Sequence, residues 1–354
     1  MTIVCGFRCR SASVLAVAAV ACVTLSGPVR AQSPSPPPAA AGKKSSPSGP
    51  AASPRPWKAP RTPWGHPDLQ GVWNNGTITP LERPGGDSRS LLSDDEVAVV
   101  DEQEAGRARA ENRPKDRAAD LELAYNQEWW DRGVSIGRTS LITDPPDGRL
   151  PPLTEEGKRR RDAYDRARRA RGPADAATDR SLYERCLVYR TVPPLPTGYN
   201  NNYRILQTPT VIAILQEQIH DTRFIYLDGR PHLGSRVRQW LGDSRGHWDG
   251  ETLVVETTNF NPQIEFFRFQ AASETLRVVE RITRVGPNEI DYRFTVYDPT
   301  TYTRPWSGIL PMRTEPGLMY EYACHEGNYG IRNVLSGYRT QEQDAQGAGK
   351  ASPR

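Results

Sequence analysis

The sequence predicts a mainly β protein, in which an antiparallel meander closes into a lipocalin-like β-barrel preceded by an extended arm and a few helices. Three observations support this fold class. The carboxy-terminal half contains about eight short runs rich in β-branched and aromatic residues. Turn-forming residues separate most of these runs, and the segment before them shows a helical charge pattern instead.

The predicted strands begin at Tyr203 and follow one another at short intervals. Asp249 followed by Gly250 predicts one tight hairpin, because that pair tolerates positive φ, and residues 286–289 predict a second. Such a meander hides its edges most economically by closing into a barrel, and a sandwich is the alternative. The predicted strands are 203–207, 211–216, 223–227, 252–258, 276–283, 290–297, 307–312 and 319–323.

The second hairpin also predicts which side chains share a face. If Val285 pairs with Ile290, then Glu280 and Arg293 lie on the same face of their two strands. Inside the barrel they would form a diagonal ion pair. On the outside they would form an exposed cross-strand salt bridge worth under about 1 kcal/mol.

Three helices are predicted before the strands. Ser93 and Glu96 form a capping box that starts a charged helix running to about residue 113. Residues 120–130 form a second helix with an apolar side. Thr154 caps a third at 155–171, where acids interleave with basic residues and therefore indicate a solvated face rather than a nucleic-acid or lipid patch.

The amino terminus predicts export. Arg8 and Arg10 precede an apolar segment, 11–25, which is too short to span a bilayer as a mature helix. The residues up to Ala31 have the small-x-small pattern of a signal-peptidase site. Cys22 as a lipoprotein cysteine and a twin-arginine signal are weaker alternatives. We expect cleavage after Ala31 and a periplasmic or secreted protein without stable membrane insertion after cleavage.

Cleavage leaves a nearly neutral chain. The precursor has a formal charge of +4, and its first 31 residues hold three arginines and no acid, so the mature charge is about +1. This balance gives little reason to expect a nucleic-acid partner. The expected partner is a small-molecule ligand or substrate.

Composition divides the chain into five segments. The signal peptide, 1–31, is followed by a Pro/Ala/Ser-rich linker, 32–60, with too few large apolar side chains to offset the entropy cost of ordering. An extended arm and helical segments occupy 61–180, and the barrel domain spans 181–338. A disordered tail is predicted at 339–354.

Two cysteines remain after cleavage, Cys186 and Cys324. In an oxidising compartment they predict a disulfide, and two buried free thiols are the alternative. The histidines show no HExxH or HxH spacing and no paired CxxC is present, so we expect no metal. No dinucleotide fingerprint or phosphate loop occurs, and we expect no cofactor. The contexts of Ser235 and Ser244 are not expected to form the nucleophile elbow of a serine hydrolase.

The densest group of ionisable side chains lies at 219–260. His220 and Asp221, with Arg223 nearby, have the composition of a general-base pair with a cationic stabiliser. Adjacent residues on a strand point to opposite sides, so His220 and Asp221 need not touch. The candidate catalytic residues are His220, Asp221, His232 and His325.

Other residues in loops and at strand ends are candidates for ligand binding. An asparagine run offers amides that donate and accept hydrogen bonds, although such a run is more often a turn device. Two tryptophans offer stacking platforms, and a disulfide would hold the last segment near the asparagine run. The candidate binding residues are Asn200, Asn201, Asn202, Tyr203, Arg223, Trp240, Asp243, Arg245, Trp248, Glu280, Arg293, Glu326 and Asn328.

Several motifs of the chain, taken in order, resemble the signatures of a family of exported bacterial proteins of undefined function. The resemblance extends from about Thr62 to Tyr338. It implies an exported, single-domain bacterial protein and carries over no catalytic residue. The motifs are TPWGHPDLQGVW, ERCLVYR, YNNNY, IHDTR, RPHL, WLGDSRGHWDGETLVVETTNFN, TRPW and YEYACHEGNYG.

Two functional hypotheses follow. The first is an exported enzyme, a lyase, isomerase or hydrolase, that performs cofactor-independent acid–base catalysis on an oxygen-rich or aromatic compound in a barrel pocket. The second is a non-catalytic, lipocalin-like protein that binds a hydrophobic or sugar-like ligand. A third reading is that the polar residues satisfy one another and leave no open pocket.

Overall fold

The computed structural model describes residues 57–107, 115–116, 130–189, 191–266, 270–271 and 273–350. The predicted signal peptide and most of the predicted linker lie outside these residues. So do all but the last residue of the helix predicted at 120–130.

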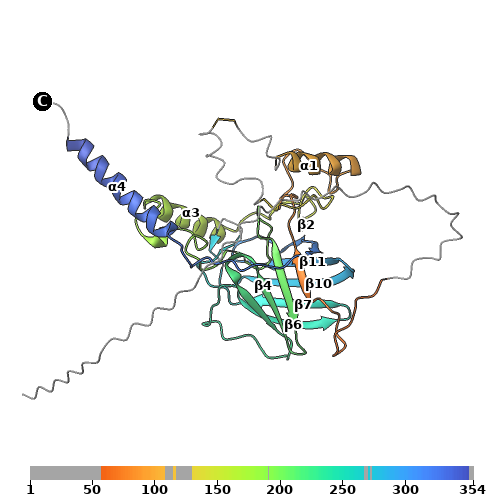
Figure 1. Ribbon diagram of the computed structural model, residues 1–354. Helices are drawn as coiled ribbons and strands as arrows, with labels where there is room; N and C mark the ends of the chain where they lie inside the picture. Colours follow the sequence, from red (N-terminus) through yellow and green to blue (C-terminus); the bar gives the residue numbers. More distant parts are fainter. Residues whose placement is uncertain are drawn as a thin grey trace, which may run out of the picture. The chain divides into compact units, whose positions relative to one another are not determined.

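Nine strands of the described chain close into a barrel, so the predicted mainly β fold is confirmed (Figure 1). They are β1 Gly71–Asn74, β3 Asn202–Gln207, β4 Val211–Gln216, β5 Thr222–Tyr226, β6 Asp243–Asp249, β7 Thr252–Thr258, β10 Arg277–Gly286, β11 Glu289–Tyr297 and β13 Met312–Thr314. Their order around the ring is β10-β7-β6-β5-β4-β3-β1-β13-β11, and β10 pairs with β11 to close it. All these neighbours are antiparallel except β5 and β6, which run parallel.

Four further strands lie outside the ring. β12 Trp306–Ile309 pairs with β11 and with β2 Ile142–Asp144, and this extends the sheet beyond the barrel. β8 Glu265–Phe266 and β9 Gln270–Ala271 pair only with each other among the described strands. The amino-terminal arm contributes β1 itself, which inserts between β3 and β13.

The described helices begin where their caps predict. Ser93 Oγ accepts a hydrogen bond from Glu96 N at 3.3 Å, and Glu96 Oε2 accepts one from Ser93 N at 2.8 Å, which is the predicted capping box. Thr154 Oγ1 accepts from Gly157 N at 2.9 Å. The α-helices are α1 Asp94–Arg107, α3 Glu155–Arg169 and α4 Gly330–Lys350, and short 3₁₀ helices occur at η3 Ala177–Asp179 and η4 Gln218–His220.

Side chains from alternate strand positions fill the barrel. Because successive side chains of a strand point to opposite sides, one set from each strand enters the lumen. The buried set from β10 and β11 is apolar apart from one carboxylate, the Glu280 side chain, and the hydroxyl of one tyrosine. These two strands contribute Val278, Glu280, Ile282, Ile290, Tyr292, Phe294 and Val296.

The register predicted for the β10–β11 hairpin is wrong by one residue. Arg284, not Val285, pairs with Ile290, and Gly286 pairs with Glu289. Val285 is thus the extra residue of a bulge. Its insertion keeps the apolar residues of both strands on one face, which a continuous ladder through Val285 would not do.

This bulge overturns the predicted ion pair between Glu280 and Arg293. Glu280 stands opposite Phe294 and is fully buried, whereas Arg293 stands opposite Arg281 on the exposed outer face. The Arg293 guanidinium pairs with Asp291 at 2.9 Å. Arg293 is therefore a surface residue and does not face the lumen.

Two segments differ from their predicted secondary structure. Residues 319–323 form no strand in the described chain; Tyr320 within this segment is 76% exposed, and Leu318 just before it is 80% exposed. Residues 339–350, where the pattern indicated a disordered tail, continue helix α4. None of the helices in the described ranges is long and apolar enough to cross a membrane.

Candidate functional site

A strained turn joins β4 to β5 at one end of the barrel. Ile219 and His220 have φ angles of 63° and 50°, so two consecutive non-glycine residues adopt the left-handed conformation. A β-branched residue rarely accepts this conformation, which costs on the order of 1–3 kcal/mol per residue. The strain turns the chain so that Asp221 enters β5 on the same side as Arg223, two positions later.

Asp221 has the environment of a proton carrier. Its side chain is half-buried, and its Oδ2 atom is buried without a hydrogen-bond partner among the described residues. Burial raises the pKa of Asp221 to about 6, and the nearby His220 opposes this shift. A carboxyl group with this pKa exchanges its proton close to neutral pH.

Two glutamines beside this turn also present buried polar atoms. Gln218 is 1% exposed, and neither its Oε1 nor its Nε2 has a hydrogen-bond partner in the described chain. Gln216 is 4% exposed, and its Oε1 also has no hydrogen-bond partner in the described chain. Because buried polar atoms are normally hydrogen-bonded, this concentration at one turn sets it apart from the rest of the barrel.

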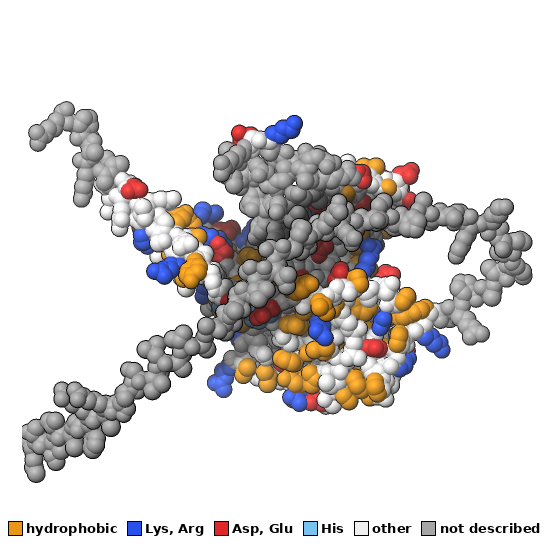
Figure 2. All heavy atoms as spheres, in the orientation of Figure 1, with side chains coloured by type: hydrophobic (Ala, Val, Ile, Leu, Met, Phe, Trp, Pro, Cys, Tyr) orange, Lys and Arg blue, Asp and Glu red, His pale blue; other side chains and the backbone are white. Residues whose placement is uncertain are grey.

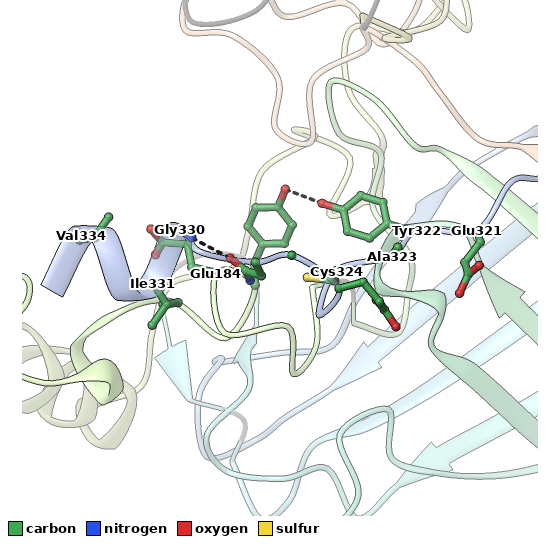
Figure 3. A pocket seen from close by; sticks show the side chains of 12 residues that line it. Glu184, Glu321, Tyr322, Ala323, Cys324, Gly330, Ile331 and Val334 are labelled. Atoms are coloured by element: carbon green, nitrogen blue, oxygen red, sulfur yellow. Dashed lines mark hydrogen bonds between the residues drawn. The ribbon is translucent and has the colours of Figure 1, made fainter. Parts of the chain in front are cut away.

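The carboxy-terminal segment packs against the same turn. His220 Nδ1 lies 2.9 Å from the carbonyl oxygen of Tyr322. The predicted disulfide between Cys186 and Cys324 is confirmed and ties this segment to the chain between β1 and β3. The hydroxyl of Tyr183 lies 2.9 Å from that of Tyr322, so a second contact joins the two segments (Figure 3).

Between these segments lies a cleft of about 560 Å³. Its lining combines two phenol rings with three carboxylates and one amide, and Figure 3 shows side chains from both segments around it. Burial acts to raise the pKa of Glu184, but hydrogen bonds from Arg180 and Ser181 lower it overall. The polar and aromatic lining residues are Tyr183, Glu184, Glu321, Tyr322, Glu326 and Asn328.

The lumen next to the turn is occupied by a buried ion pair. Arg223 donates from Nη1 to Glu280 Oε1 at 2.8 Å and from Nε to Ser244 Oγ at 2.9 Å, and Tyr292 donates to Glu280 Oε1 at 2.5 Å. Burial acts to lower the pKa of Arg223, but the Glu280 charge raises it overall. Burial raises the pKa of Tyr292. The cavity left beside Arg223 and Glu280 has a volume of only about 20 Å³.

A second predicted group meets on the outside of the barrel. His232 Nδ1 lies 3.0 Å from Asp243 Oδ2, and His232 Nε2 lies 3.3 Å from Glu256 Oε1. Asp243 is 3% exposed and also pairs with Arg245 at 2.6 Å. Leu233 N donates to the same Oδ2 at 2.9 Å, so Asp243 holds a loop in place. Both ring nitrogens of His232 thus face carboxylates.

The asparagine run is a turn device. Asn201 is fully buried, where its Oδ1 accepts from Thr197 N at 2.9 Å and its Nδ2 donates to Thr197 O at 3.0 Å. Asn202 Oδ1 accepts from Asn74 at 3.0 Å, and Asn200 has a φ of 55°. Tyr203 is buried and lines the small lumen cavity. These residues shape the end of β3.

The remaining predicted residues are scattered. Trp240 packs in a small cluster with Leu241, and Trp248 packs against the main core and lies 5.3 Å from the ring of His66. His325 is exposed and does not line the cleft that contains Glu326 and Asn328.

Residues 242–246, Gly-Asp-Ser-Arg-Gly, match the letters of a G-x-S-x-G nucleophile elbow. Such an elbow exposes its serine on a sharp turn between a strand and a helix. Ser244 instead lies within β6, is 2% exposed, and hydrogen-bonds to Arg223 and to Thr257. It supports the lumen network and is not presented as a nucleophile.

Sequence reasoning missed several residues of the site. Gln216 was predicted only as the last residue of a strand, and Gln218 was not singled out; Tyr183, Glu184 and Tyr322 lie in irregular segments. One available signal was the predicted disulfide, because it places the neighbours of Cys186 and Cys324 side by side. The described chain contains no group of three or more His, Cys, Asp or Glu side chains arranged to hold a metal ion.

No protein-family model matches this chain, and comparisons with curated proteins and with solved structures give no match either. The resemblance to exported bacterial proteins therefore stays a prediction from the motifs.

Proposed function

We propose that this protein is an exported small-molecule-processing protein in which Asp221 carries protons at the end of the barrel without a resident cofactor. The observation that supports this most is the state of Asp221. Its carboxyl group is half-buried, has a raised pKa of about 6 and keeps one oxygen free of hydrogen bonds within the described chain. Perturbed carboxyl groups of this kind concentrate at catalytic sites.

The cleft beside the turn supplies space for a substrate. Its volume of about 560 Å³ falls within the usual range of small-molecule sites. The rings of Tyr183 and Tyr322 offer stacking surfaces, and Glu184 and Asn328 offer hydrogen-bonding groups to hydroxyls. These features suit an oxygen-rich or aromatic compound. Asp221 is not among the residues that line the cleft, but its neighbour His220 contacts the backbone of Tyr322, which does line it.

The reaction class that fits is acid–base catalysis by a lyase, isomerase or hydrolase. At neutral pH a carboxyl group with a pKa of about 6 is mainly ionised and accepts a proton from a bound substrate. His220 is exposed beside it and is the second proton carrier. Arg223, named earlier as a cationic stabiliser, is fully engaged by Glu280, Ser244 and Thr257, so we give it a structural role.

The alternative is a non-catalytic binding protein. The lumen cavity of about 20 Å³ has room for about one water molecule, so a ligand bound as in an open barrel would need the lumen to rearrange. The cleft is the better ligand site under either hypothesis. The two differ only in whether the bound compound is converted.

The experiment screens sugars, aromatic compounds and organic acids for a rise in melting temperature, and then tests each hit for turnover. Asp221→Asn is compared with the wild type and with Asp228→Asn, a matched control at an exposed aspartate that pairs with Arg230 outside the cleft. We expect Asp221→Asn to bind the hit but to turn it over at least about 100-fold more slowly. Unchanged turnover in Asp221→Asn contradicts the proposal, and binding without turnover in the wild type supports the alternative.

A further inference from the structure

The loop between β5 and β6 presents apolar and basic side chains together. Leu233 and Val237 are 43% and 49% exposed. Arg236 is exposed and Arg238 is half-buried, and neither forms an ion pair with a described residue. Residues 229–242 contain no aspartate or glutamate. A surface loop that exposes aliphatic side chains among uncompensated arginines is unusual for a segment whose only neighbour is water.

Buried side chains hold this loop in a fixed shape. Leu233 N donates to Asp243 Oδ2 at 2.9 Å, and Leu233 O accepts from Asn259 Nδ2 at 2.8 Å. Arg245 Nε donates to the carbonyl oxygen of Pro231 at 3.0 Å, and Val237 N donates to Gly234 O at 2.9 Å. The backbone beside Leu233 is therefore anchored on both sides while its side chain stays outside. The fold presents this side chain rather than leaving it free to collapse onto the barrel.

The adjacent outer face of the barrel continues this surface. On β3, β4 and β5, Leu206, Ala213 and Phe224 form one cross-strand row, and Leu206 and Phe224 are 46% and 51% exposed. Two positions after Phe224 on the same side, Tyr226 lies under the guanidinium of Arg230 at 4.4 Å. Figure 2 shows hydrophobic side chains gathered on the lower part of the visible barrel, with single basic side chains beside them.

We propose that this surface, formed by Leu233, Arg236, Val237 and Arg238 with the row through Phe224, docks the protein on an anionic lipid surface. Exposed aliphatic side chains enter the headgroup region, and arginines pair with acidic headgroups while their stems stay in the apolar layer. A tyrosine beside an arginine suits the same boundary. A second copy of this chain is a poorer occupant, because two loops of like charge would face each other. The proposal concerns a surface distinct from Asp221 and the cleft.

The test measures co-sedimentation of the purified mature protein with vesicles of phosphatidylethanolamine and phosphatidylglycerol, and with vesicles of neutral phosphatidylcholine. We expect binding to the anionic vesicles that weakens as salt is added. Arg236→Gln/Arg238→Gln should lower the partition coefficient about 25-fold, at about fivefold for each charge removed. Leu233→Ser/Val237→Ser should lower it as well. Leu91→Ser/Val99→Ser, at similarly exposed positions outside this surface, should bind as the wild type does.

Each other outcome overturns the proposal. If the wild type does not bind the anionic vesicles, an anionic lipid surface is not the partner. If the loop variants bind the vesicles as strongly as the wild type does, another surface of the molecule makes the contact. If the wild type forms a dimer and does not bind vesicles, and Leu233→Ser/Val237→Ser is monomeric, the surface serves self-association instead. Circular dichroism and melting temperature confirm that each variant is folded, so a loss of binding reports on the surface itself.

Discussion

Asp221 is the residue whose chemistry departs most from what its position on the chain implies. It follows two left-handed residues, so its carboxyl group is drawn from solvent into the end of the barrel. There it gains no hydrogen bond to Oδ2 from the described residues, and burial raises its pKa to about 6. A group held this way costs stability when ionised, which is the usual signature of a site kept for function.

At the residue scale, we predict that Asp221→Asn stabilises the protein above pH 6. The folded-state pKa of about 6 exceeds the ordinary value of 3.8, so the folded protein binds the proton more tightly and loses stability as the pH rises between these values. Because Asp221 is partly exposed to solvent, the free energy of unfolding of Asp221→Asn should exceed that of the wild type by only roughly 1 kcal/mol. This corresponds to about 2 °C in melting temperature. Thermal melts at pH 4 and pH 8 check this, because Asp221→Asn and the wild type should have the same melting temperature at pH 4. A gain of equal size at both pH values would point to packing instead of charge.

A second prediction concerns the buried pair in the lumen. Arg223→Met leaves the fully buried Glu280 without its cation and should lower the free energy of unfolding by about 3–5 kcal/mol. Arg223→Met/Glu280→Gln removes both charges, keeps an acceptor for Tyr292, and should recover most of that loss. Chemical denaturation of the two variants measures the difference. A double variant no more stable than the single one would show that packing, not charge, sets the cost.

At the element scale, the bulge at Val285 decides which face of β10 and β11 enters the lumen. Deleting Val285 removes the extra residue and lets Gly286 follow Arg284 directly, so Arg284 still pairs with Ile290 and Glu280 stays in the lumen; we expect cooperative folding to persist. Val285→Ala keeps the extra residue, and because the Val285 side chain is 44% exposed this control should be nearly neutral. Denaturation curves compare the two. A deletion variant that no longer unfolds cooperatively would show that the hairpin needs the bulge itself.

The strands were predictable where their residues alternate or branch at Cβ, and less so elsewhere. Residues 211–216 and 252–258 were predicted with the bounds that β4 and β7 have. β6 was not predicted as a strand because its sequence, DSRGHWD, carries charges and a glycine whose roles appear only on pairing with β7. The segment 319–323 is rich in aromatic residues but finds no strand partner.

The site was less predictable than the fold. Sequence proximity suggested that His220, Asp221 and Arg223 act together, yet Arg223 is engaged by Glu280, 57 residues away. The disulfide and the pairing of His232 with Asp243 bring distant segments together, and only the first had a composition signal. Burial of Asp221 depends on the left-handed turn before it, which no propensity rule assigns to Ile219.

The disulfide between Cys186 and Cys324 joins the carboxy-terminal segment to the chain between β1 and β3. It spans 138 residues, so Cys186→Ser/Cys324→Ser should lower the free energy of unfolding by about 2–4 kcal/mol. Hydrogen exchange should quicken at 320–330, whereas amides of β3 and β4 should stay protected. Exchange at 320–330 as slow as in the wild type would show that hydrogen bonds such as Tyr183 to Tyr322 suffice to hold the cleft.

The molecule as a whole separates a filled barrel from an open cleft at its end. The ion pair and aromatic side chains occupy the lumen, and the cleft forms between the segments around Tyr183 and Tyr322, the second of which contacts His220. Asp221, at the end of the barrel, should titrate near neutral pH. Carbon NMR of the carboxyl groups, with the Asp221 signal identified by its absence from Asp221→Asn, measures this directly. We expect a midpoint near pH 6; a midpoint near the ordinary value of 3.8 would show that burial does not shift the pKa of this carboxyl group.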